Sequence, residues 1–261
     1  MSRTFFAALH YDGGRFVGWQ RQAVGRTVQG EVEGALERLA GRRVVAHAAG
    51  RTDAGVHAQG MGVSFSLPAT WEAPTVRRAM NALLPRDCWI ERVRPTRAGF
   101  HARKSALERE YRYDIGLDPA ALSPFRRPYE WALGRPLDQQ VLREAAAAVL
   151  GEHQFRAFAA KGEPKPHYRC RLRLAEWRER VDGRGLSFNV AADRFLHHMV
   201  RLLVGTMVEM GLHRRPVSDM AALLAREDNS ETSPPAPPEG LYFVSAEYPA
   251  GAFDDIAGDA R

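Results

Sequence analysis

Cysteine and lysine are scarce in this sequence, and each absence narrows what the protein can be. Only two cysteines occur, Cys88 and Cys170, and they are too far apart to form a CxxC pair. The sequence therefore predicts neither a zinc knuckle nor a disulfide framework, and we expect two buried thiols in a reducing compartment. Three lysines stand among 37 basic residues, so arginine carries nearly all of the positive charge.

Long apolar runs are missing as well. No uninterrupted apolar segment is long enough to span a bilayer, and the first residues enter a short strand-like run instead of the apolar core of a signal peptide. We therefore expect a soluble cytoplasmic protein with no membrane partner. The 261 residues, 45% of them hydrophobic, suffice for one large domain or two ordinary ones with a real core.

The net charge favours a polyanionic partner. The formal charge is +6 and the isoelectric point is near 9.7. Basic side chains that neutralise phosphates gain affinity by releasing counterions, and arginine can both fork onto a phosphate and stack on a base. Biased genome composition would produce the same excess of arginine, so charge alone does not identify the partner.

The first part of the chain predicts alternating strands and helices. Thr27 is a plausible N-cap, and apolar residues at helical spacing follow it until Gly41. A second helix is expected at 74–84, before Pro85, and strands are expected at 3–11, 44–49, 61–67 and 88–93. The resulting order, β-α-β-β-α-β, is that of a ferredoxin-like unit.

The second part repeats this order. We expect strands at 108–115, 170–180, 186–191 and 241–248, helices at 138–150 and 194–211, and a mobile tail from residue 249. The step Asp182-Gly183 is typical of a hairpin turn. We therefore predict two halves, 1–104 with the loop that contains Asp53 and 105–261 completing a cleft beside that loop.

A short polar loop between two expected strands carries the first candidate for chemistry. Asp53 is flanked by glycines and small residues, Gly50-Arg51-Thr52-Asp53-Ala54-Gly55, so a ligand could approach the carboxylate closely. The alternative is a polar turn in which Asp53 bonds only its own backbone.

An arginine in an apolar helix is the second candidate. Arg201 lies within the expected helix 194–211, and a buried guanidinium must find an anion because it cannot lose its proton. Asp53 is a natural partner, since the ion pair would keep that carboxylate ionised and oriented. A structural salt bridge to Glu209 or to another acid is the alternative.

The strand 108–115 is the third candidate. Arg109, Tyr111 and Tyr113 would share one face, which suits base stacking and phosphate contact, although tyrosines are also ordinary strand residues. The histidines do not predict a metal site. His197 and His198, expected to be consecutive on a helix, would point about 100° apart, and no HExxH or equivalent spacing occurs.

The Asp53 segment, Gly50 to Ala58, resembles the signature of the tRNA pseudouridine synthase A family. Other segments resemble that family in the right order, from about Thr4 to Tyr248: Tyr11-Asp12-Gly13, Gly18-Trp19-Gln20-Arg21-Gln22, Thr27-Val28-Gln29-Gly30, Phe100-His101-Ala102-Arg103, Tyr111-Arg112-Tyr113, Phe195-Leu196-His197-His198-Met199-Val200-Arg201 and Glu239-Gly240-Leu241-Tyr242. Residues 161–169 depart from the family's usual Arg-Thr stretch, so no RNA contact is carried over there.

The resemblance implies a fold and a set of residue roles. The expected class is α+β, the pseudouridine synthase fold, with two ferredoxin-like (βαββαβ) halves forming a continuous mixed or antiparallel sheet flanked by helices. Asp53 would be the catalytic aspartate, and Tyr111 would stack on the target base and assist proton removal. Further roles are implied for Arg201 (pairing with Asp53), for Leu241 (packing under the uracil) and, in RNA positioning, for Arg51, Gln20, Arg21 and Arg103.

The same resemblance implies a reaction and its partners. Uridine at positions 38–40 in the anticodon arm of tRNA would be isomerised to pseudouridine, without a cofactor or a metal, by a homodimer. Two other classes remain open: a non-catalytic RNA-binding or RNA-chaperone protein, in which Asp53 is dispensable, and a metal-dependent nuclease, whose ligand motifs are missing.

Overall fold

A computed structural model describes residues 2–160 and 167–254 of the chain, which fold as two compact units. The first unit contains the residues up to Arg109 and those from Phe243 onward, and the second is Glu110–Tyr242. This division differs from the predicted halves 1–104 and 105–261. It does so because the C-terminal strand returns to the first unit, where a Cβ built on Gly60 would lie 2.3 Å from the carbonyl oxygen of Val244.

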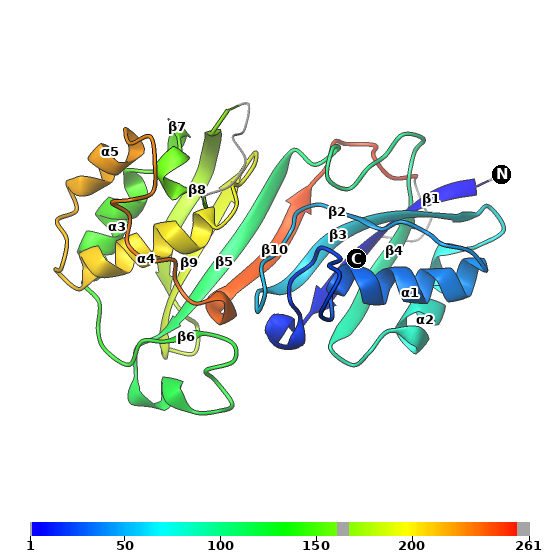
Figure 1. Ribbon diagram of the computed structural model, residues 1–261, viewed down its shortest axis with the longest axis horizontal. Coiled ribbons are helices and arrows are strands. Elements are labelled where there is room, and N and C mark those ends of the chain that lie inside the picture. The colour runs from blue at the N-terminus through cyan, green and yellow to red at the C-terminus, as the bar shows by residue number, and fades with distance from the viewer. Residues whose placement is uncertain (1, 161–166, 255–261) are drawn as a thin grey trace. The chain divides into compact units, whose positions relative to one another are not determined.

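The first unit is an antiparallel sheet with two helices. β1 pairs with both β3 and β4, and the strand order here is β4-β1-β3-β10. Helices α1 and α2 lie side by side on the sheet (Figure 1). The elements of this unit are β1 (Ser2–Tyr11), η1 (Gly13–Arg15), α1 (Val28–Ala40), β2 (His47–Ala48), β3 (His57–Pro68), α2 (Ala73–Leu83) and β4 (Cys88–Pro95).

Helix α1 shows why the sequence folds as it does locally. The Thr27 side chain accepts a hydrogen bond from the backbone N–H of Gly30, which confirms the predicted N-cap. Gly41 ends the helix in the left-handed conformation, at φ 64°. Val28, Val32 and Leu36 form the buried stripe of the helix. The N-cap, the buried apolar stripe and the terminating glycine of α1 were therefore all predictable from the sequence.

The strands of the second unit follow the order β5-β9-β8-β7, with β6 pairing in parallel to β5. The predicted turn between β8 and β9 is confirmed, with Gly183 at φ 65°. The elements are β5 (Glu108–Gly116), η2 (Pro119–Leu122), β6 (Trp131–Ala132), α3 (Gln139–Ala147), β7 (Gly151–Gln154), η3 (Arg156–Phe158), β8 (Arg169–Glu179), β9 (Gly185–Ala192), α4 (Met199–Gly211), α5 (Asp219–Leu224), η4 (Pro238–Gly240) and the start of β10 (Leu241–Glu247), whose residues from Phe243 onward belong to the first unit.

Several expected boundaries were wrong. The strand expected at 44–49 is reduced to β2, while β6, β7 and α5 were not predicted. Helix α4 begins at Met199 instead of 194, because His198 takes the left-handed conformation at φ 64°. Residues 249–254 are packed where a mobile tail was expected: the ring of Phe253 contacts Phe6 and Phe100. The remainder of that expected tail, and residues 161–166 of the divergent segment, lie outside the described residues.

The α+β class is confirmed, with a large sheet of mixed strand pairing flanked by helices. Within the described residues, no helix has the length and apolar character needed to cross a membrane.

Candidate active site

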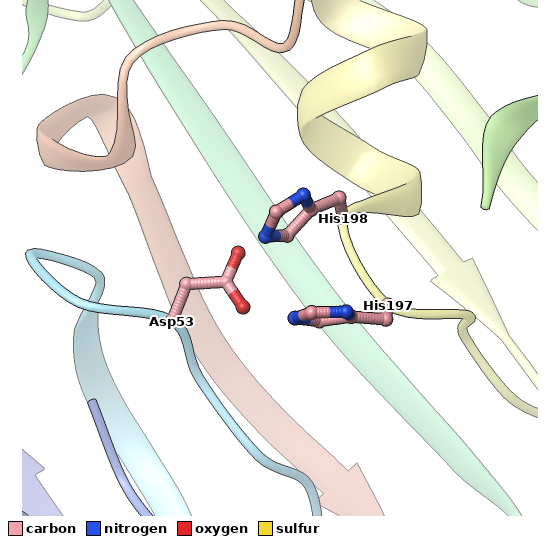
Figure 2. Close-up of side chains that lie close together, drawn as sticks. All are labelled: Asp53, His197 and His198. Atoms are coloured by element: carbon pink, nitrogen blue, oxygen red, sulfur yellow. The ribbon is translucent and has the colours of Figure 1, made fainter. Parts of the chain in front are cut away.

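Asp53 lies on the loop between β2 and β3, partly buried, and its backbone is fixed on both sides (Figure 2). The preceding residue, Thr52, is 7% exposed, and its carbonyl oxygen accepts a hydrogen bond from the N–H of Trp19 at 3.0 Å. On the other side, the carbonyl of Asp53 accepts from the N–H of Val56 at 3.3 Å, and the N–H of Gly55 donates to Phe16. The loop is therefore more than a local turn that caps itself.

The segment that holds this loop is 11–19, which follows β1. Two of its glycines are required by close approach to the Asp53 loop. A Cβ on Gly13 would lie 2.0 Å from the carbonyl oxygen of Val56. Gly18 is at φ +107°, and a Cβ there would lie 2.8 Å from the carbonyl oxygen of Thr52. The motifs Tyr11-Asp12-Gly13 and Gly18-Trp19, separate in the sequence from the Asp53 loop, pack directly against it.

His57 closes the far end of the loop. Its side chain is 2% exposed, and Nδ1 accepts a hydrogen bond from the N–H of Gly13 at 3.0 Å. Asp12 Oδ1 lies 3.2 Å from the same nitrogen and also accepts from the N–H of Gly14. No role was predicted for His57 or Asp12 in the sequence, where only their presence in family-like segments marked them.

Three of the predicted RNA-positioning residues lie on the Asp53 loop and on the 19–27 segment. Arg51 is exposed at the start of the Asp53 loop. Gln20 donates to Gln29 Oε1 at 3.0 Å, and Arg21 donates to Glu33 Oε2 at 2.7 Å. Both acceptors are buried residues of α1, so the 19–27 segment is tied to that helix while the Arg21 side chain stays 47% exposed.

Arg103 is exposed on a tight loop whose backbone carbonyls accept hydrogen bonds from Arg109. The Arg109 guanidinium donates to the carbonyl oxygens of Ala49, Ala106 and Arg103, at 3.3, 3.0 and 2.5 Å. The sequence left open whether the face that Arg109 shares with the two tyrosines contacts phosphate or belongs to the core. Arg109 holds backbone carbonyls, while Arg103 and Lys104 are the exposed cations of this loop.

The face shared by Tyr111 and Tyr113 is mostly core. Tyr113 is completely buried and donates its hydroxyl hydrogen bond to the carbonyl of Pro237 at 2.7 Å. Burial raises the Tyr113 pKa well above its ordinary value. Tyr111 is 8% exposed and meets the ring of Phe195 edge to face, with the centroids 4.9 Å apart. Of the two tyrosines, only Tyr111 keeps an accessible fraction for a base.

Arg201 lies in the first turn of α4 and not in the middle of a longer helix, and its side chain is only partly buried. Its Nε donates to the carbonyl oxygen of Ala236 at 2.7 Å, and its own carbonyl accepts from the N–H of Ala236 at 2.9 Å. The premise of a deeply buried charge was therefore wrong. Arg201 and Asp53 belong to different units, and their ion pair stays a prediction.

Leu241 is placed by the segment just before it. The connector 233–240 runs along α4, where a Cβ on Gly205 would lie 2.1 Å from the carbonyl oxygen of Pro234. At its end, a Cβ on Gly240 would lie 2.7 Å from the Tyr113 ring and 2.8 Å from the carbonyl of Asp114. Leu241, 6% exposed, then begins β10.

His197 and His198 occupy the turn that precedes α4 (Figure 2). They were expected on a helix with diverging side chains. Because His198 is left-handed, the two rings instead lie 4.1 Å apart, at an interplanar angle of 42°. A non-glycine residue at φ 64° is uncommon, and such strain is typical of functional turns.

Comparison with known proteins decides the family. The sequence profile described as "tRNA pseudouridine synthase" matches residues 7–103 and 145–249. A protein named tRNA pseudouridine synthase A from Thermus thermophilus is 42% identical over 252 residues, 95% of this chain and 97% of its own length. Proteins of the same name from Moorella thermoacetica and Myxococcus xanthus are 41% and 39% identical, over 92% and 93% of this chain and 97% and 91% of their own lengths.

The chain belongs to the tRNA pseudouridine synthase family. The two matched stretches contain Asp53, Arg201 and Leu241, while Tyr111 lies between them. The structure also shows contacts of Tyr11, Thr52 and His57, for which the sequence predicted no role. The Tyr11 hydroxyl bonds Thr52, and His57 accepts a hydrogen bond from the backbone of Gly13. The only signal for them in the sequence was their place in short family-like motifs.

Proposed function

We propose that this protein isomerises uridine to pseudouridine in the anticodon stem-loop of tRNA, at positions 38–40, with Asp53 as the catalytic carboxylate. The observation that carries the proposal is the Asp53 loop. Its sequence matches the family's motif, and its backbone is fixed by Trp19, Phe16 and Val56. A fixed carboxylate on a glycine-flanked loop suits attack on a buried substrate atom.

The reaction needs no external group. The bond from ribose C1′ to uracil N1 breaks, the uracil turns over, and a bond from C1′ to C5 forms, while C5 loses a proton and N1 gains one. Asp53 acts at the sugar by one of two routes: attack on C1′, or removal of the C2′ proton to give a glycal. A deuterium at C2′ separates them, because only the glycal route breaks that C–H bond before the new C–C bond forms.

Tyr111 and Leu241 are proposed to receive the base once it leaves its stack. Both are mostly buried residues of the second unit with small accessible fractions, 8% and 6%, as the floor or wall of a base pocket requires. Extracting a base from a helix costs a few kcal/mol, which stacking on an aromatic ring partly offsets. Arg201 is proposed to pair with Asp53 and keep it ionised.

Exposed arginines are proposed to bind the rest of the tRNA. In the first unit these are Arg51, Arg21 and Arg103, with Gln20 beside them. In the second unit, the alternation of β8 exposes Arg169, Arg171 and Arg173 while the residues between them are buried. We further propose that the protein works in the cytoplasm as a homodimer. A fully active monomer by gel filtration and turnover assay would contradict the dimer.

The decisive test compares the wild type with Asp53→Asn on unmodified tRNA transcript in EDTA, with pseudouridine mapped by carbodiimide treatment and primer extension. We expect a signal at positions 38–40 from the wild type only. The variant should lose at least a thousandfold in rate while tRNA affinity and the melting temperature stay within error, since Asn keeps the side-chain volume.

The alternatives give different results. Binding without pseudouridine from either protein would favour an RNA-binding or chaperone function, and equal signal from both would remove Asp53 from the chemistry. Activity that depends on added metal, with tRNA fragments on a gel, would identify a nuclease.

A further inference from the structure

A buried pair of hydroxyls joins the end of β1 to the Asp53 loop. The Tyr11 hydroxyl and Thr52 Oγ1 share a hydrogen bond of 2.7 Å, and the two residues are only 4% and 7% exposed. Tyr11 is the last residue of β1, and Thr52 immediately precedes Asp53. The pair therefore joins the sheet to the residue next to the candidate catalytic carboxylate.

The bond completes the fixation of Thr52. The Thr52 carbonyl is already held by the N–H of Trp19, and Gly18 allows that approach because any Cβ there would meet the same oxygen at 2.8 Å. The hydroxyl bond to Tyr11 fixes the other end of the residue, its side chain. With both ends held, the peptide that leads into Asp53 has one orientation.

We propose that Tyr11 is a positioning residue for Asp53, acting through Thr52. Tyr11 does not need to touch the substrate. Reaction rates are sensitive to the placement of a reacting group, and a misplacement of about 1 Å can cost on the order of a hundredfold. Without the bond to Tyr11, a small rotation of the peptide between Thr52 and Asp53 would move the Asp53 carboxylate by a comparable distance while the binding surfaces stay in place.

This inference rests on the proposed function, in which Asp53 is catalytic. Its test uses the full-length protein and four variants: Tyr11→Phe, Thr52→Val, the double variant, and Thr52→Ser. Each is assayed for kcat and KM on tRNA transcript and for melting temperature. Transcript affinity is measured in the Asp53→Asn background, where turnover does not interfere. Thr96→Val is the matched control, because it deletes a buried hydroxyl that donates to the carbonyl of Thr4 in the same unit, away from the loop.

We expect Tyr11→Phe and Thr52→Val each to lower kcat roughly tenfold, with KM and affinity unchanged. The double variant should also be roughly tenfold slower and not a hundredfold slower, because both changes remove the same bond. Its melting temperature should recover, since two apolar groups of the original shape leave no buried hydroxyl unpaired. Thr52→Ser should stay within about twofold of the wild type, and Thr96→Val should lose stability without losing kcat.

A purely structural role for the pair gives a different pattern. Activity would then follow the melting temperature, and the double variant would regain both, which would overturn the inference. Wild-type turnover by Tyr11→Phe would overturn it as well. Failure of the proposed function is distinguishable, because it would appear as an inactive wild type or an active Asp53→Asn variant.

Discussion

The two units hold their candidate residues in different ways. In the first unit, the Asp53 loop is fixed by hydrogen bonds and buried polar side chains that reach it from a segment about 40 residues earlier. In the second unit, Arg201 and Leu241 contact or follow the connector 233–240. This connector packs against Gly205 of α4, and its Ala236 carbonyl accepts a hydrogen bond from the Arg201 side chain.

This difference suggests a division of tasks. A dense polar network defines a single loop conformation, which suits a group that must meet one atom of the substrate. The connector of the second unit packs on a glycine of α4 and is held by hydrogen bonds from Arg201 and Tyr113 to its carbonyls, an arrangement that suits residues that receive a base. The predictions below test that division in order of decreasing effect.

The largest effect is expected from Gly13→Ala. Its Cβ would lie 2.0 Å from the Val56 carbonyl oxygen, a backbone atom that cannot rotate away, so the two segments must separate. We expect a destabilisation of about 3 kcal/mol or more and a loss of kcat of at least a hundredfold. Urea denaturation and turnover measured on the same preparation check both numbers.

Gly34→Ala is the matched control for that prediction. Gly34 is exposed in α1 and a Cβ there meets nothing within 4 Å. The change should stabilise the protein by about 0.5–1 kcal/mol through helix propensity and leave kcat unaltered. If both alanine variants behaved alike, close approach between the segments would not be the reason for Gly13.

Gly205→Ala is the counterpart in the second unit. Its Cβ would lie 2.1 Å from the carbonyl oxygen of Pro234, but alanine also favours the helix by about 1 kcal/mol. We expect a net loss of about 2 kcal/mol in unfolding free energy. If contact positions the base-receiving residues, KM for tRNA should rise more than kcat falls. A fall in kcat with unchanged KM would break the division between the units.

Particular elements show how far the sequence could lead. Helix α1 was predictable because its cap, apolar stripe and glycine stop are all local signals. The start of α4 was not, since Phe195 and Leu196 continue the helical spacing while His198 takes a left-handed conformation that only tertiary contacts impose on a histidine. The spacing of apolar residues in a sequence does not reveal such a break before a helix.

The candidate site shows the same limit. The Asp53 loop stood out because its glycines and carboxylate are contiguous in the sequence. The partners that hold it, Tyr11 and Gly18, lie more than 30 positions away, and single-sequence reasoning has no measure of long-range pairing. Arg201 was singled out because a deeply buried charge was expected in the middle of a helix. In the structure it is instead a partly buried residue of the first turn of α4, bonded to the Ala236 carbonyl.

A smaller effect is expected from the exposed arginines of β8, and it should fall on binding alone. Glu152 pairs with both Arg169 and Arg171, at 3.5 and 3.2 Å, so this one carboxylate is shared between two guanidinium groups. Replacing the three arginines by glutamine should weaken tRNA binding about tenfold at 0.15 M salt. The slope of log affinity against log salt should decrease by about one for each phosphate that the variant no longer neutralises.

Turnover at saturating tRNA should not change in this variant. Arg38→Gln, an exposed arginine of α1, is the control for the removal of one charge and should leave the salt slope as it is in the wild type. A β8 variant with the wild-type slope would mean that its arginines form only surface ion pairs and bind no phosphate.

The smallest effect is expected at Asp87, which supports the 11–19 segment. Asp87 accepts the N–H of Asp12 with its carbonyl and holds Arg26 with both carboxylate oxygens, at 2.6 and 2.8 Å, while Arg26 lies over the Phe16 ring. The Arg26 guanidinium lowers the Asp87 pKa below its ordinary 3.8. This ion pair therefore contributes stability above about pH 4, which is lost as the pH falls through the lowered folded pKa.

Asp87→Asn should accordingly cost about 1 kcal/mol of unfolding free energy at pH 7, as an accessible but bidentate pair does. The difference from the wild type should shrink as urea denaturation is repeated from pH 5 to pH 3, because the carboxylate of the unfolded wild type protonates first, at its ordinary pKa, and this removes the stability that the ion pair contributes. If Asp87→Asn were as stable as the wild type already at pH 7, Asp87 would support the segment through its backbone carbonyl only, and the polar network around the Asp53 loop would not extend to this charge.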